Sequence, residues 1–90
     1  MALPLDGALD FAGVGRWLAR ADELVAAGGL DLSAVSRVDS AGIALLLELR
    51  RRAERSGQRL PLSGVPEQAR SLMRFLEVDT LLLDGAAPSA

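Results

Sequence analysis

The sequence of 90 residues has the length of one small domain, and half of its residues are apolar, as in an ordinary globular protein. It contains no Cys, His, Lys, Tyr or Asn, and all ten basic residues are Arg. This composition excludes disulfides, thiol and imidazole catalysis, Cys/His zinc sites, lysine Schiff bases and the lysine of a P-loop. The net charge of −2 also lacks the basic character that is typical of nucleic-acid-binding proteins.

The sequence carries no sign of a membrane span or of a secretory signal. Its longest uninterrupted apolar run, residues 41–47, is far shorter than the roughly 20 residues that cross a bilayer. The first ten residues lack the basic start and the sustained apolar stretch of a signal peptide. We therefore expect a cytoplasmic protein with one domain over residues 1–84 and a flexible tail over residues 85–90.

The first third of the chain predicts a strand followed by a helix. Residues 3–5 alternate weakly before the turn signal Asp6-Gly7, which indicates a short strand at the start. Residues 10–27 carry apolar side chains three and four residues apart, as an amphipathic helix does. The side chains expected on the core face of this helix are Phe11, Val14, Leu18, Ala21 and Val25. Asp10 suits its N-cap, and Gly28-Gly29 would end it.

The middle third predicts a strand, a loop and the strongest helix of the chain. Residues 30–32 alternate as a short strand does, and residues 33–38 are expected to form a loop. Asp39 and Ser40 open a helix that runs to about Ser56 and is closed by Gly57.

The last third predicts a strand at residues 59–63, a helix at 67–77 and an apolar end at 79–83 that forms a strand or packs on the sheet. Alternating strands and helices indicate an α/β domain whose consecutive strands are parallel. The strands are short and lack the continuous Val/Ile runs of strands that are covered on both faces. We therefore predict a small mixed sheet of about four short strands with helices packed mainly on one face.

The central helix has more apolar surface than one sheet contact requires. Its apolar side chains span about 200° of the helix circumference, whereas packing on one sheet needs a stripe of about 100° or slightly more. The core stripe is best centred on Leu46, Leu49 and Ala53, which leaves Ile43 and Leu47 on a flank. They either pack under a neighbouring helix of the same domain, or form a partner-facing patch that starts at a serine and ends at an arginine.

Ser40 also allows two interpretations. It suits the N-cap of the central helix, a position that Ser and Asp favour. Alternatively it is a phosphoacceptor, because a helix N-terminus presents free N–H donors and a positive dipole end to a phosphate group. Gly42, which lowers helix propensity inside the first turn, indicates that another group approaches the backbone closely there.

The remaining charged residues offer no catalytic set. The basic run at residues 50–52, with Arg55, is typical of a solvated helix face, and otherwise of a docking surface for an acidic partner or anionic lipid heads. The aspartates have simpler roles as caps and turn formers than as ligands of Mg²⁺, and no nucleophile–base pair is available. We predict no catalytic residue, no metal and no cofactor.

The region from residue 31 to residue 47 resembles the signature of STAS domains. These domains carry a strand that ends in D-L-S, a loop, a D-S/T-x-G-L/I motif and a Leu-rich helix. The MlaB-like subgroup is the most similar, on the run V-S-R-V-D at 35–39, the helix A-L-L-L-E-L at 44–49 and the match at 60–65. STAS domains usually begin with a further strand, so the sheet is expected to be one strand short or the chain to be trimmed.

The resemblance implies a non-catalytic accessory subunit of a phospholipid-transport ABC complex, held at the inner membrane by an MlaF-like ATPase subunit. The residues that it implies for docking are Asp39, Ser40, Ala41, Gly42, Ile43, Ala44, Leu47 and Arg51. The alternative within the same fold is an anti-sigma-factor antagonist, in which Ser40 is phosphorylated by a kinase partner. In either case the apolar flank is expected to form a homodimer when the chain is isolated.

Overall fold

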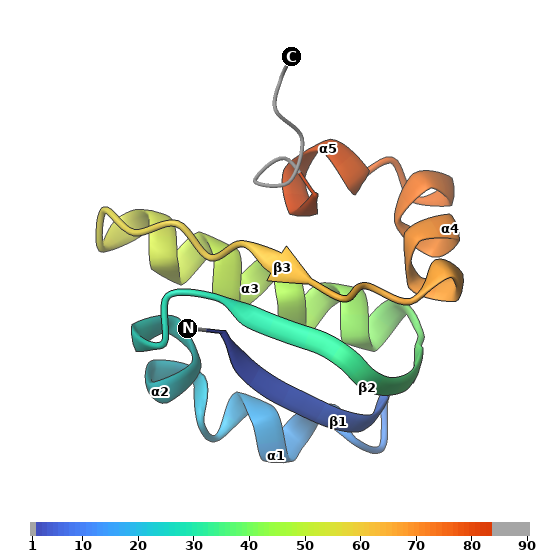
Figure 1. Cartoon of the computed structure of the whole chain (residues 1–90), viewed down its shortest axis with the longest axis horizontal. Coiled ribbons are helices and arrows are strands. Elements are labelled where there is room, and N and C mark those ends of the chain that lie inside the picture. The colour runs from blue at the N-terminus through green and yellow to red at the C-terminus, as the bar shows by residue number, and fades with distance from the viewer. Residues whose placement is uncertain (1, 84–90) are drawn as a thin grey trace.

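The computed structural model describes residues 2–83, so the predicted tail at residues 85–90 lies outside the described residues. Figure 1 shows the long central helix running behind the sheet, with the short helices of residues 14–26 next to the first strand and those of residues 67–82 on the side of the last strand. The elements in chain order are β1 (Leu3–Leu9), α1 (Val14–Leu18), α2 (Ala21–Ala26), β2 (Leu30–Val38), α3 (Ser40–Arg55), β3 (Leu62–Ser63), α4 (Glu67–Phe75) and α5 (Asp79–Leu82).

The sheet is parallel throughout and has the order β1-β2-β3. The helices α1, α2 and α3, which connect the parallel strands, contact one another and form one layer on one face of the sheet. The side chains that the strands turn toward this face are buried: Leu5, Leu9, Leu30, Leu32, Val35, Val38 and Leu62. The opposite face exposes Pro4, Asp6, Ser33 and Ser63. The predicted α/β class, parallel order and one-sided helix layer are confirmed, whereas the mixed sheet of about four strands becomes three parallel strands over residues 2–83.

Two strands are longer than the sequence predicts. β1 continues through the expected turn at Asp6-Gly7, and β2 continues through the expected loop at residues 33–38. The register between them shifts at two places, one beside Asp6 and one beside Gly7, where φ is +73°. These irregularities break the alternation of buried residues along β2, so strict period two is lost although the pairing continues.

The predicted helix over residues 10–27 is in fact two short helices. Asp10 Oδ1 accepts from the Gly13 N–H at 2.8 Å and so caps a turn, and a second turn separates α1 from α2. The prediction for Phe11 is wrong, because this ring lies in the first turn and is 86% exposed. The side chain that anchors α1 is Trp17, which is 4% exposed and has the guanidinium carbons of Arg16 and Arg20 at 4.7 Å and 5.0 Å from its ring centroid.

The second half of the chain follows the prediction more closely. α3 begins at Ser40 as expected, and its core stripe of Leu46, Leu49 and Ala53 is at most 1% exposed. The apolar end was predicted to form a strand or to pack on the sheet, and it is not a strand. It forms α5, which inserts Leu82 into the core and contacts α3 and α4. The helix predicted at residues 67–77 is α4, and Leu76, its C-cap, is 38% exposed.

Gly42 allows α3 to lie directly against the end of β1. A Cβ atom at this position would meet the Leu9 carbonyl oxygen at 2.1 Å and Val38 Cγ1 at 2.8 Å. Both contacts are too short for any side chain, and the first is to backbone, which cannot rotate away. The close approach inferred from Gly42 is therefore confirmed, and the approaching group belongs to the same chain.

Gly42→Ala is therefore expected to destabilise the protein by about 1–3 kcal/mol, because α3 must move away from β1 and β2. Gly15→Ala is the matched control, since a Cβ atom there meets nothing within 4 Å and alanine raises helix propensity in α1. Chemical denaturation of both variants measures the difference. A Gly42→Ala protein as stable as the control would contradict the packing argument.

Candidate functional site

Asp39 organises the start of α3. Its Oδ1 accepts from the N–H groups of Ala41 at 2.8 Å and Gly42 at 3.1 Å, which makes Asp39 the N-cap. Its Oδ2 accepts from the Phe11 N–H at 3.1 Å, and its own N–H donates to the Leu9 carbonyl at 3.1 Å. One carboxylate thus joins the first turn of α3 to the turn that follows β1.

These contacts also determine the protonation of Asp39. Partial burial by itself raises the pKa of the carboxyl group. This effect is outweighed by the backbone N–H donors of Gly42, Phe11 and Ala41 and by the charge of Arg37, which lower the pKa. The pKa of Asp39 is consequently below its usual value. The charged form, which accepts all three hydrogen bonds, is the form that the folded state favours.

Ser40 is exposed on the first turn of α3, and its hydroxyl makes no hydrogen bond within residues 2–83. The capping interpretation of Ser40 is wrong, because Asp39 fills that role. The hydroxyl is therefore free to react or to contact a partner. It sits at the positive end of a 16-residue helix and next to the Asp39 carboxylate.

Four of the predicted docking residues lie along one face of α3. Ser40, Ala44, Leu47 and Arg51 follow the spacing i, i+4, i+7 and i+11, which aligns side chains on a helix. Ser40, Ala44 and Arg51 are exposed, and Leu47 is half-buried against the core. We call these four residues the Ser40 stripe.

The other predicted docking residues lie beneath this stripe. Ile43 is 2% exposed and belongs to the hydrophobic core, so the expectation that it forms an exposed flank is wrong. Gly42 is buried against Leu9, and Ala41 is half-buried. The apolar surplus of α3 is therefore smaller than its helical period suggests, because α3 is enclosed on more than one side by its own domain.

An apolar groove borders the Ser40 stripe on the side of α1. Its volume is about 320 Å³, and its lining residues are Phe11, Val14, Leu18, Ala41, Ala44, Leu45 and Glu48. Phe11 is 86% exposed and Leu18 is 46% exposed, and both belong to the apolar lining of this groove. The sequence missed this surface because it placed Phe11 in the core; the glycines at positions 13 and 15 were the signal that the helix starts later.

The basic run at the end of α3 is mostly used inside the domain. Glu48 binds Arg51 at 2.6 Å and Arg52 at 2.7 Å, and these hydrogen bonds lower the pKa of Glu48. Arg50 pairs with Glu54 at 3.6 Å and donates to the Leu81 carbonyl at 2.5 Å. The interpretation as a solvated, internally paired helix face is therefore favoured over a broad cationic surface.

Among residues 2–83, no three acidic or other ligating side chains lie close enough together to hold a metal ion. None of the helices in the same range is long and apolar enough to cross a membrane.

The comparisons with known proteins point to one family. A family model described as "Mlab, STAS domain" matches residues 1–84. Among solved structures, the chain is similar to the one titled "Structure of the Anti-Sigma Factor Antagonist SpoIIAA in its Unphosphorylated Form". The identity is 25% and the TM-score 0.62, over 80% of this chain and 70% of that chain. No curated protein matches the chain.

Asp39→Asn is expected to lower the stability of the protein near neutral pH, because a neutral amide binds the three N–H donors less strongly. The pKa of Asp39 is lower in the folded protein than in the unfolded chain, where it is about 3.9. The charged carboxylate therefore stabilises the folded protein above about pH 3.9, and this stabilisation is lost as the pH falls through the folded-state pKa. The difference in melting temperature between the two proteins should therefore shrink below about pH 4.

Asp22→Asn is the control for this prediction, since Asp22 is exposed and has no hydrogen-bonded or ion-paired partner within residues 2–83. Thermal unfolding of the three proteins across the acid range measures the effect. A difference between wild type and Asp39→Asn that stays constant with pH would show that charge at this position is unimportant.

Proposed function

We propose that the chain, which belongs to the STAS domain family, is a non-catalytic subunit of a phospholipid-transport ABC complex. Members of this family are regulatory and partner-binding modules. In this proposal the start of α3 docks on the MlaF-like ATPase subunit. The family model that matches residues 1–84, whose description names Mlab, supports this role. The complex would hold the chain at the cytoplasmic side of the inner membrane.

The observation that carries the proposal is the exposed apolar surface beside Ser40. Phe11 and Leu18 project from one wall of the groove, and Ala44 forms the opposite wall on α3. Burying a phenylalanine or leucine side chain contributes about 1.5–3 kcal/mol, so a partner that covers this groove gains affinity from it. Exposed apolar patches rimmed by polar residues are typical of protein interfaces.

A second candidate function, an anti-sigma-factor antagonist, is favoured by a different observation. The Ser40 hydroxyl is exposed and unbonded within residues 2–83, and the similar solved structure is titled as such an antagonist in its unphosphorylated form. In this proposal a kinase partner, the anti-sigma factor, phosphorylates Ser40. The phosphate would add about two negative charges next to Asp39 and to the groove, which opposes docking without unfolding α3.

A substitution in the groove tests this docking surface. Ala44→Glu should reduce binding of the ATPase subunit at least about tenfold, because a charge would have to lose its water in an apolar contact. Ala26→Glu is the matched control, since Ala26 is also an exposed alanine on a helix but lies on α2, outside the groove. Co-purification and a titration with the ATPase subunit measure both.

An Ala44→Glu protein that folds normally and still co-purifies with the ATPase subunit would remove the groove from the interface. Size-exclusion chromatography of the isolated chain belongs to the same experiment. The sequence led us to expect a homodimer through the apolar flank of α3; if the isolated chain instead dimerises through this groove, Ala44→Glu should convert it to a monomer.

Another prediction separates the two functions. Incubation with an anti-sigma-factor kinase and ATP should add one phosphate, seen by intact mass, if the chain is an antagonist. Ser40→Ala should abolish the gain, and Ser71→Ala, which changes another exposed serine, should not. The absence of any gain, or a gain that Ser40→Ala leaves unchanged, would exclude regulation at Ser40.

A further inference from the structure

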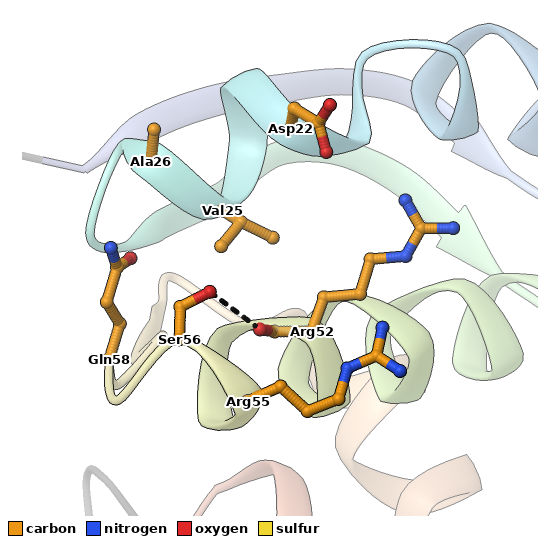
Figure 2. A pocket seen from close by; sticks show the side chains of 7 residues that line it. All are labelled: Asp22, Val25, Ala26, Arg52, Arg55, Ser56 and Gln58. Carbon is orange, nitrogen blue, oxygen red and sulfur yellow. Dashed lines mark hydrogen bonds between the residues drawn. The ribbon is translucent and has the colours of Figure 1, made fainter.

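A polar hollow lies at the far end of α3 from Ser40, between the last turns of α2 and α3. Its volume is about 430 Å³, within the range of about 300–1,000 Å³ that is usual for small-molecule sites. Figure 2 shows Asp22, Val25 and Ala26 on the α2 side and the other lining residues on the α3 side. The residues on the α3 side are Arg52, Arg55, Ser56 and Gln58.

The turn that closes α3 gives this hollow a firm wall. The Gln58 N–H donates to the Ala53 carbonyl at 2.8 Å, and the Gly57 N–H donates to the Glu54 carbonyl at 3.0 Å. Gly57 has φ +73°, so the turn is a Schellman motif. Two carbonyls that would otherwise present negative charge at this helix end are therefore hydrogen-bonded, and Gln58 is fixed next to Ser56.

The hollow has a cationic end that the domain neutralises only in part. Arg55 has no ion-paired or hydrogen-bonded partner within residues 2–83. Arg52 binds Glu48 through Nε, which leaves its two terminal amino groups as donors. In Figure 2 the side chains of Arg52 and Arg55 extend in the same direction along α3, with the Arg52 guanidinium nearer to Asp22, and Ser56 and Gln58 lie at the other end.

We propose that this hollow binds a phosphate ester that also carries hydroxyl groups. Arg52 and Arg55 both line the hollow, and guanidinium groups donate well-oriented hydrogen bonds to phosphate oxygens. Asp22 and Gln58 provide acceptors for ligand hydroxyls, and Val25 provides an apolar contact for the carbon backbone between them. Asp22 repels a bare phosphate ion, so the hydroxyl groups are part of what the site recognises.

This chemistry has two sources, a free sugar or glycerol phosphate and the headgroup of a phospholipid. The experiment therefore has two arms with the full chain. In the first, glycerol 3-phosphate and inorganic phosphate are titrated by two-dimensional NMR. In the second, flotation measures binding to vesicles that contain phosphatidylglycerol. Neither arm depends on the proposed docking surface, which lies at the other end of α3.

Arg55→Gln should weaken binding at least about tenfold in whichever arm shows it, because a charge-assisted contact to phosphate is lost. Arg59→Gln is the matched control: it removes the same charge from an exposed arginine outside the hollow and should leave binding nearly unchanged. Asp22→Asn should reduce the preference for glycerol 3-phosphate over inorganic phosphate. The substitution removes the negative charge that strengthens hydrogen bonds from the ligand hydroxyl groups and that repels inorganic phosphate.

The proposal is supported if binding in either arm is saturable, is weakened by Arg55→Gln and is unaffected by Arg59→Gln. The arm that shows this binding then identifies the source of the ligand. Equal losses in the two arginine variants would mean that only net charge matters, which overturns the proposal. Absence of binding in both arms overturns it as well.

Discussion

The structure depends on the close contact between the first turn of α3 and the end of β1. Gly42 presents no side chain to the Leu9 carbonyl, and the Asp39 N–H donates to the same oxygen at 3.1 Å. The Asp39 carboxylate then binds both the first turn of α3 and the N–H of Phe11. A side chain at position 42 would separate these elements, and the Phe11 turn, the helix start and the groove between them would lose their common support.

The two ends of α3 differ in the kind of surface that they present, since one end has an apolar groove beside a hydroxyl group and the other has an arginine. At the N-terminal end, Ser40 and the apolar groove lie side by side, so a charge added to the hydroxyl would act directly on whatever occupies the groove. In the middle, Glu48 binds Arg51 and Arg52 and prevents the basic run from acting as one cationic surface. Only at the C-terminal end does Arg55 remain unpaired within residues 2–83.

The sequence predicted elements well where their signals are local. α3 combines a strong cap, an apolar period and a closing glycine at position 57, and its limits agree with the structure within one residue. β2 was predicted too short because register shifts against β1 disrupt the alternation that marks a strand. The helix expected over residues 10–27 is interrupted, since an apolar period says which residues share a face but not whether the backbone stays helical between them.

For the candidate site, the family signature, the Asp39–Ser40 helix start and a close approach to the backbone at Gly42 could be predicted from the sequence. It could not determine which apolar side chains of this region remain on the surface. Ile43 is enclosed and Phe11 is exposed, the reverse of what their periodicity indicated. The physical reason is that capping and helical period arise within a few consecutive residues, whereas exposure is decided by segments far apart in the chain that pack only in the folded protein.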